Sequence, residues 1–261
     1  MKKFLSISLL VAFVVFGAIS QAAASFEDGT LIRVVFDHTA AGVEVATDFG
    51  AFNATSAGSV SSTSLGSGSL ALSDFGSGKS WSDLYVAYYV IDTANADLWT
   101  SGPYNGSQTS NPGRWSMVIN AAGSLQLNFD GTMIPSTVIH TGSGFTSVSQ
   151  DKGTMGGGFS YYDTMGLSGL NWGSFAGFTD GGGEANLAAL AASGGYVDQT
   201  LYYYNNPNDT SSGLMIANIR TYADGRIEIT PASASAVPIP GAVWLLGSGL
   251  LGFIGIRRRS A

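Results

Sequence analysis

The chain has 261 residues, of which 45% are hydrophobic, and carries 11 Lys and Arg against 18 Asp and Glu, for a formal net charge of −7. This acidic balance argues against nucleic acid and anionic lipid as partners, because both require a basic surface to neutralise phosphate. Cysteine is absent. Disulfides and thiol nucleophiles are therefore excluded, and stability has to come from a buried core.

Residues 1–24 have the pattern of a secretory signal peptide. A basic start at residues 1–3 precedes an apolar run over 4–19, and Ala22 and Ala24 are the small residues that signal peptidase reads. We expect cleavage after Ala24, so that the mature protein begins at Ser25. The exported body, residues 25–236, then holds six basic and all 18 acidic residues, a net charge of −12.

The body over residues 25–230 is predicted to be one all-β domain. Short runs rich in β-branched and aromatic residues alternate with turn-forming residues; they are 31–36, 43–47, 84–91, 115–119, 125–129, 137–140, 158–162, 197–204, 214–222 and 226–230. Asp224-Gly225 predicts a tight hairpin. We expect an antiparallel β-sandwich or jelly roll with one short helix over 184–192, which Gly194 would end.

A low-complexity segment rich in Ser, Gly, Thr and Ala spans residues 53–78. We predict small-residue edge strands with wide loops there, and such edges favour self-assembly. Residues 76–80, Gly-Ser-Gly-Lys-Ser, resemble a phosphate-binding loop, but Ser73 stands where that motif needs its first glycine. A strand-like run also follows in place of a helix, so we interpret these residues as a surface turn.

Catalytic patterns are weak. The chain has two histidines, His38 and His140, no serine in a G-x-S-x-G elbow and no paired metal-ligand spacing, so neither a hydrolytic triad nor a zinc site is indicated. His140 is expected to make a structural hydrogen bond at a strand end. A glycosidase needs only two carboxylates close in space, so that alternative stays open, although we expect a protein that is not an enzyme.

The strongest pattern for ligand recognition combines aromatic rings with amide and carboxylate oxygens, as a sugar surface requires. The candidate carbohydrate-binding residues are Trp99, Tyr104, Tyr202, Tyr204, Asn205, Asn208 and Asp209. The alternative is that the strand tyrosines pack in the core and that 205–209 is turn chemistry. The same oxygens, with the 180–184 loop, would suit calcium, although no EF-hand spacing is present; no other cofactor or metal is expected.

The C-terminal tail predicts a membrane segment. After a linker over 231–237, residues 239–256 are apolar and uncharged, and Arg257, Arg258 and Arg259 follow. A helix of this length covers about 27 Å of a hydrocarbon core about 30 Å thick. The arginines would stay in the cytoplasm, which places the body outside.

The tail resembles a known sorting signal. Val237, Pro238 and Pro240 precede a span rich in Trp, Leu and Gly and then the arginine cluster, so residues 237–259 resemble the VPLPA-type variant of the PEP-CTERM signal. Ile239 stands where the type motif has Glu, and Gly241 where the variant has Ala. The resemblance implies recognition by an exosortase, a membrane protease of Gram-negative bacteria that make exopolysaccharide. The alternative is an ordinary tail anchor, with the prolines as a helix stop.

Together these features predict an exported protein that signal peptidase and an exosortase process. It would be anchored transiently in the inner membrane and then reach the cell surface or the extracellular matrix of a biofilm. There it would act as a structural or carbohydrate-interacting component associated with exopolysaccharide. The alternatives are a secreted polysaccharide hydrolase and a self-assembling matrix or fibre subunit.

Overall fold

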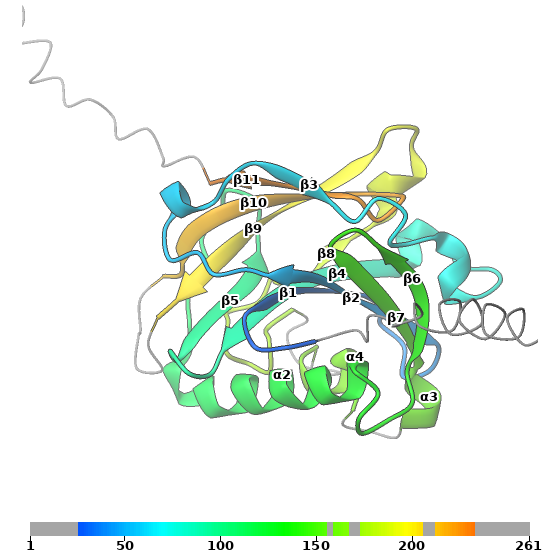
Figure 1. Cartoon of the computed structure of the whole chain (residues 1–261), viewed down its shortest axis with the longest axis horizontal. Coiled ribbons are helices and arrows are strands. Elements are labelled where there is room, and N and C mark those ends of the chain that lie inside the picture. Colours follow the sequence, from blue (N-terminus) through cyan, green and yellow to red (C-terminus); the bar gives the residue numbers. More distant parts are fainter. Residues whose placement is uncertain (1–25, 156–158, 167–172, 206–211, 233–261) are drawn as a thin grey trace, which may run out of the picture.

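A computed structural model describes residues 26–155, 159–166, 173–205 and 212–232 (Figure 1). The strands are β1 (Thr30–Asp37), β2 (Val43–Ala51), β3 (Thr63–Leu65), β4 (Leu84–Asp92), β5 (Asp97–Gly102), β6 (Thr137–Gly142), β7 (Phe145–Asp151), β8 (Ala185–Asn186), β9 (Tyr196–Tyr204), β10 (Leu214–Tyr222) and β11 (Ile227–Pro231). The α-helices are α2 (Trp115–Phe129), α3 (Lys152–Met155) and α4 (Tyr161–Thr164). Short 3₁₀-helices are η1 (Ala57–Ser59), η2 (Leu72–Phe75), η3 (Trp81–Asp83), η4 (Pro112–Arg114) and η5 (Ala188–Ala191).

Within the described residues, all eleven strands belong to one antiparallel sheet in the order β3-β11-β10-β9-β5-β4-β1-β2-β7-β6, with β8 paired to β4. The predicted antiparallel β class is confirmed. The expected sandwich or jelly roll would have two packed sheets, whereas this protein has a single sheet that curls into a half-barrel. Figure 1 shows α2 under one face of the central strands and β10 and β11 lying across the other face.

The curled sheet has a hydrophobic core on each face. Along β1, Leu31 and Val35 point into the half-barrel, whereas Ile32, Val34 and Phe36 point toward α2. Successive side chains of a strand alternate between faces, so a strand that is covered on both sides is apolar throughout. This burial explains why the central strands are near-continuous hydrophobic runs in the sequence.

Helix α2 replaces two of the predicted strands, those over 115–119 and 125–129. Val118, Ala122, Leu125 and Phe129 recur every three or four residues and are buried under the sheet. Leu127, which strand alternation would bury beside Leu125, is 45% exposed. A short run of apolar residues can fit either the two-residue period of a strand or the 3.6-residue period of a helix. Only the full 15-residue length of α2 distinguishes the helix from a strand.

Other segments also differ from the prediction. Strands β5 and β7 lie where no strand was predicted. The predicted strand at 158–162 falls partly outside the described residues, and α4 occupies its end. The predicted helix over 184–192 is a short strand, β8, followed by one 3₁₀ turn, η5. Within 53–78, β3 is three residues long and forms one edge of the sheet.

The predicted Asp224-Gly225 hairpin is confirmed between β10 and β11. Gly225 has a φ of +79°, and its N–H donates to the Tyr222 carbonyl at 2.9 Å. A Cβ at this position would lie 2.5 Å from Ser69 Oγ and 2.6 Å from the Leu70 backbone nitrogen. Glycine is therefore required both by the turn and by the close packing of the hairpin on residues 69–70.

No helix within the described ranges combines the length and apolar character that crossing a membrane requires. The predicted signal peptide over 1–24 and the predicted sorting signal over 237–259 lie outside the described residues. The same is true of Asn208 and Asp209.

Candidate functional site

The convex face of β9, β10 and β11 carries a regular array of polar and aromatic side chains. Strand register aligns them in three rows, which are Thr200, Asn218 and Thr230; Asp198, Arg220 and Glu228; and Tyr196 and Tyr222. We call these residues, together with Tyr104, the ladder face. The opposite face of the same strands is mainly apolar and belongs to the core of the half-barrel, where Gln199 and Thr221 are buried as well.

A shallow cavity of about 120 Å³ lies on the ladder face. Its lining residues are Tyr104, Asp198, Asn218, Arg220, Glu228 and Thr230. All but one of these come from the three adjacent strands, and Tyr104 comes from the loop after β5. The cavity is therefore built on a rigid sheet and completed by one loop.

Charged groups on the ladder face are paired with one another. Arg220 donates to both oxygens of Asp198, from Nε at 2.8 Å and from Nη2 at 3.0 Å, and its guanidinium lies 3.7 Å from the ring centroid of Tyr196. The hydrogen bond with Asp198 raises the pKa of Arg220 above its usual range. The two hydrogen bonds to Asp198 hold the guanidinium over the Tyr196 ring and neutralise its charge.

Glu228 is held in the same way on the next strand. It accepts a hydrogen bond from the Tyr222 hydroxyl at 2.7 Å and pairs with Arg226, which lies 3.6 Å from the Tyr222 ring centroid. The hydrogen bonds from Tyr222 and Arg226 lower the pKa of the Glu228 carboxyl. Glu228 is thus an ionised hydrogen-bond acceptor at neutral pH.

The loop after β5 is attached to the ladder face by two hydrogen bonds. The Asn105 N–H donates to Thr200 Oγ1 at 2.9 Å, and Asn218 Nδ2 donates to Asn105 Oδ1 at 3.3 Å. These bonds hold Tyr104, which is 47% exposed, beside the row of Thr200. Tyr196, which is 44% exposed, lies four residues along β9, or about 13 Å away. Exposed rings therefore mark both ends of the array.

The structure separates the residues that the sequence grouped as carbohydrate-binding. Tyr104 lies on the ladder face and Asn205 is exposed at the far end of β9. Trp99, Tyr202 and Tyr204 are buried, so their rings offer no face to a glycan, and that part of the prediction is corrected. The Tyr202 hydroxyl donates to the Pro103 carbonyl at 2.8 Å, which supports the loop that carries Tyr104.

Sequence reasoning missed Tyr196, Asp198, Arg220, Tyr222 and Glu228. A signal for part of the set was present, because polar residues alternate with isoleucines along 218–220 and 226–230. The hairpin turn at Asp224-Gly225 fixes the register that places Arg220 opposite Glu228. The prediction relied on aromatic content and therefore selected Tyr202 and Tyr204, at the buried end of β9.

The residues considered for calcium do not converge in the described part of the chain. Asp180 accepts a hydrogen bond from Thr109 Oγ1 at 2.8 Å, whereas Glu184 pairs with His38 Nε2 at 2.7 Å. Across the described residues, no group of three or more His, Asp or Glu side chains is arranged to hold a metal ion. His140 makes the expected structural bond, with its Nε2 2.9 Å from Asp74 Oδ2.

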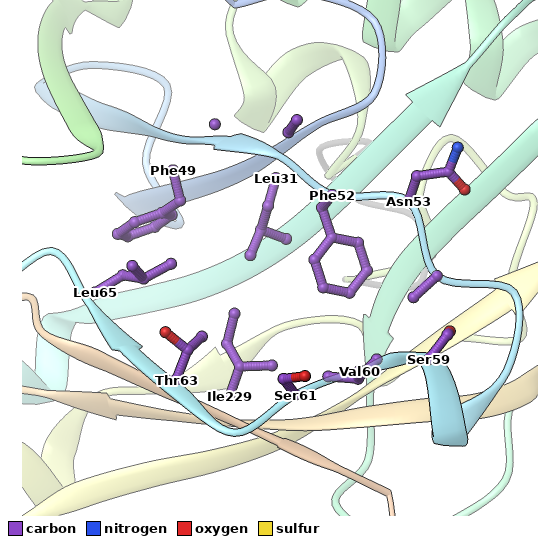
Figure 2. Close-up of a pocket in the computed structure, with 13 residues that line it drawn as sticks. Leu31, Phe49, Phe52, Asn53, Ser59, Val60, Ser61, Thr63, Leu65 and Ile229 are labelled. Atoms are coloured by element: carbon purple, nitrogen blue, oxygen red, sulfur yellow. The ribbon is translucent and has the colours of Figure 1, made fainter.

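A second cavity, of about 280 Å³, lies at the mouth of the half-barrel. Figure 2 shows Leu31, Phe49 and Phe52 on one side of it and Val60 and Ile229 facing them from the other. The Ser59, Ser61 and Thr63 hydroxyls are the polar side chains nearby, together with Asn53. Few groups here could orient a hydroxyl-rich ligand, so the ladder face is the better candidate for glycan recognition.

Comparisons with protein-family models, curated proteins and solved structures found no match to this chain.

Proposed function

We propose that this protein is an exported, non-enzymatic component of the cell surface or matrix that binds polysaccharide through the ladder face. The observation that supports this is the array itself, with exposed tyrosines at both ends and amide, carboxylate and hydroxyl groups between them. The C–H faces of sugars pack on aromatic rings, and their hydroxyls need donors and acceptors at fixed positions. The sheet supplies both on one rigid surface.

The charge pairing favours a neutral, hydroxyl-rich glycan over a polyanion. Arg220 on the ladder face is neutralised by Asp198, and Arg226 beside it pairs with Glu228, so neither cation is left unpaired for a sugar acid. The net charge of −12 over residues 25–236 also repels anionic polymers. We therefore expect binding that depends weakly on salt.

Replacing Tyr104 with alanine is expected to weaken polysaccharide binding about tenfold, because a lost stacking ring is worth about 1 kcal/mol or slightly more. Affinity electrophoresis in gels that contain the polysaccharide of the host would measure the change. Leu127→Ala on α2 is the matched control, since Leu127 is 45% exposed and lies on another element. Equal binding by wild type and Tyr104→Ala would remove the ladder face as the glycan site.

A polysaccharide hydrolase is the second candidate, because Asp198 and Glu228 flank Arg220 on the ladder face. They lie two strands apart, or about 10 Å between backbones, near the upper limit for a glycosidase pair. A general acid needs a raised pKa, however, and hydrogen bonds from Tyr222 and Arg226 lower that of Glu228. If the wild type releases reducing sugar from the polysaccharide and Glu228→Gln does not, the protein is a hydrolase and the binding proposal is overturned.

The proposal that the body is exported rests on the sequence of the two ends. We expect the native protein to begin near Ser25 and to end within residues 237–241, as intact mass from the host would show. The double variant Pro238→Ala, Pro240→Ala should keep its arginines and stay in the membrane fraction. Retention of the tail by both proteins would indicate a simple tail anchor in place of exosortase processing.

A further inference from the structure

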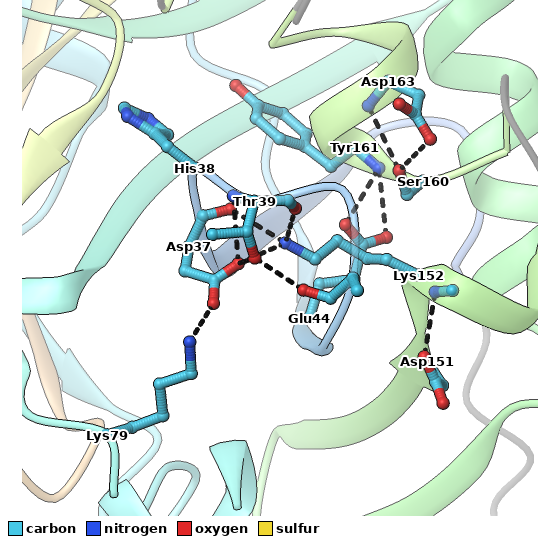
Figure 3. Close-up of polar contacts among 12 residues, drawn as sticks. Asp37, His38, Thr39, Glu44, Lys79, Asp151, Lys152, Ser160, Tyr161 and Asp163 are labelled. Atoms are coloured by element: carbon cyan, nitrogen blue, oxygen red, sulfur yellow. Dashed lines mark hydrogen bonds and ion pairs between the residues drawn. The ribbon is translucent and has the colours of Figure 1, made fainter.

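A buried cluster of charged side chains lies where β1 and β7 end, away from the ladder face (Figure 3). Asp37 is the last residue of β1, and Lys152 directly follows β7. Their side chains are 4% and 0% exposed, and the two residues are 115 apart in sequence. The sheet places the strands close together, since β1 pairs with β2 and β2 pairs with β7.

The lysine amine lies against the aspartate carboxyl. Lys152 Nζ is 2.5 Å from Asp37 Oδ1, and it also donates to the carbonyls of Asp37 at 2.8 Å and Thr39 at 2.7 Å. Because a C–O bond is only about 1.2 Å long, Nζ lies within about 3.7 Å of Asp37 Cγ. The Tyr162 ring, with its centroid 4.9 Å from Nζ, helps to cover the pair.

Two further charged groups complete the cluster. Lys79 donates to Asp37 Oδ2, the oxygen that Lys152 does not contact. Glu44 is fully buried, and both of its oxygens lie 3.0 Å from the Tyr161 backbone nitrogen. Burial raises the pKa of Glu44 to about 7, against the opposing effects of the Tyr161 N–H and the charge of Lys152. Glu44 can therefore exchange a proton near neutral pH.

We propose that Lys152 and Asp37 condense to an isopeptide bond that joins the end of β1 to the end of β7. In this reaction Glu44 carries protons, and Lys79 stabilises the charge that develops on Asp37 Oδ2. The bond is an intramolecular modification, distinct from glycan binding at the ladder face.

The reaction balances without any further reagent. The Lys152 ammonium gives one proton to Glu44, and the freed electron pair of Nζ attacks Asp37 Cγ to form the C–N bond. Oδ1 then takes one proton from the nitrogen and one from Glu44, the Cγ–Oδ1 bond breaks, and Oδ1 leaves as water. The products are one amide, one water and the regenerated Glu44 carboxylate, so an ion pair becomes a neutral bond.

The buried position favours this reaction for two physical reasons. In water, amine and carboxylate are hydrated ions, but burial removes that hydration and raises the free energy of the pair. The fold also holds the reacting atoms at a near-attack distance, which converts a bimolecular step into a unimolecular one. A covalent tie across 115 residues would serve an exported chain that has no cysteine.

An ordinary buried ion pair would show the same contacts. Burial by itself would raise the pKa of Asp37, but the hydrogen bonds from Lys152 and Lys79 outweigh burial and lower this pKa to about 2. The isopeptide bond and the ion pair differ in one property: the covalent bond survives denaturation, whereas the ion pair does not. The measurement therefore has to be made on unfolded protein.

Denatured full-length protein should be digested with trypsin and analysed by mass spectrometry. The expected product is fragment 34–79 joined to an uncut fragment 115–220, lighter than their sum by one water, because acylated Lys152 resists trypsin. Separate fragments 34–79, 115–152 and 153–220 would overturn the proposal. None of these fragments includes either terminus, so processing of the ends does not affect the result.

Variants test the assigned roles. Lys152→Arg should abolish the link, and Asp37→Asn should give the same linked mass, because ammonia then leaves in place of water. The Glu44→Gln variant should fold, as judged by circular dichroism, but remain unlinked. The control is Asp83→Asn, because Asp83 is an exposed carboxylate near Asp37, and this variant should link fully. A linked Glu44→Gln protein would overturn the assignment of proton transfer to Glu44.

Discussion

Replacing Arg33 with methionine is expected to lower the free energy of unfolding by about 3 kcal/mol, because buried hydrogen-bonding groups lose their partner. Arg33 is 0% exposed on β1, and its Nη1 donates to the Gly225 carbonyl at 2.6 Å. Its Nη2 donates to Thr47 Oγ1 at 2.8 Å and to Ser69 Oγ at 3.1 Å. Arg33 thus joins the centre of the sheet to the β10–β11 hairpin and closes the half-barrel.

Urea unfolding followed by tryptophan fluorescence would measure the effect of Arg33→Met, with an unchanged m-value showing that the unfolded states are comparable. Arg226→Met is the matched control. The Arg226 side chain is 32% exposed and pairs with Glu228, so its loss should cost less than about 1 kcal/mol. Similar midpoints for wild type and Arg33→Met would contradict the bridging role of Arg33.

Replacing Trp99 with alanine is expected to destabilise the protein by about 4 kcal/mol, as large aromatic truncations in cores do. Trp99 is 0% exposed, its Nε1 donates to the Ala54 carbonyl at 2.7 Å, and its ring centroid lies 5.0 Å from that of Tyr203. Thermal unfolding and the glycan-binding assay should be run on the same preparation.

Tyr104→Ala provides the contrast for Trp99→Ala. Because the Tyr104 side chain is 47% exposed, its removal should change stability by less than about 0.5 kcal/mol while weakening glycan binding. The two variants therefore separate a core role from a binding role. A Trp99→Ala protein that keeps its stability but loses binding would place Trp99 in the site and contradict its burial.

Some of the fold could be predicted because its cause is local. The β10–β11 hairpin follows from the positive φ that Gly225 accepts and from the alternation of Ile227 and Ile229 on one face. The central strands follow from their continuous apolar runs. Helix α2 could not be predicted in the same way, since Leu125 and Phe129 fit one face of either a strand or a helix, and only packing under the sheet shows that Leu127 lies on the other face.

The candidate site was predicted only in part, because an aromatic residue looks the same in sequence whether it lies in the core or on the surface. Tyr196, Tyr202 and Tyr204 lie on the same strand, yet Tyr202 and Tyr204 are buried and Tyr196 is exposed. The residues packed against them decide this difference. Tyr204 meets Phe178 at a ring distance of 5.1 Å, a contact that no local pattern indicates.

The sequence by itself determined the acidic character, the absence of disulfides, the antiparallel β class and the glycine turns, since composition, period and φ preference are properties of neighbouring residues. It also carries the signals at both ends, which remain predictions. Only the tertiary structure decided that one sheet curls on itself, that Arg220 lies between Asp198 and Glu228, and that Lys152 meets Asp37. These contacts depend on strand order and register, which long-range packing selects among many arrangements that the local pattern would equally allow.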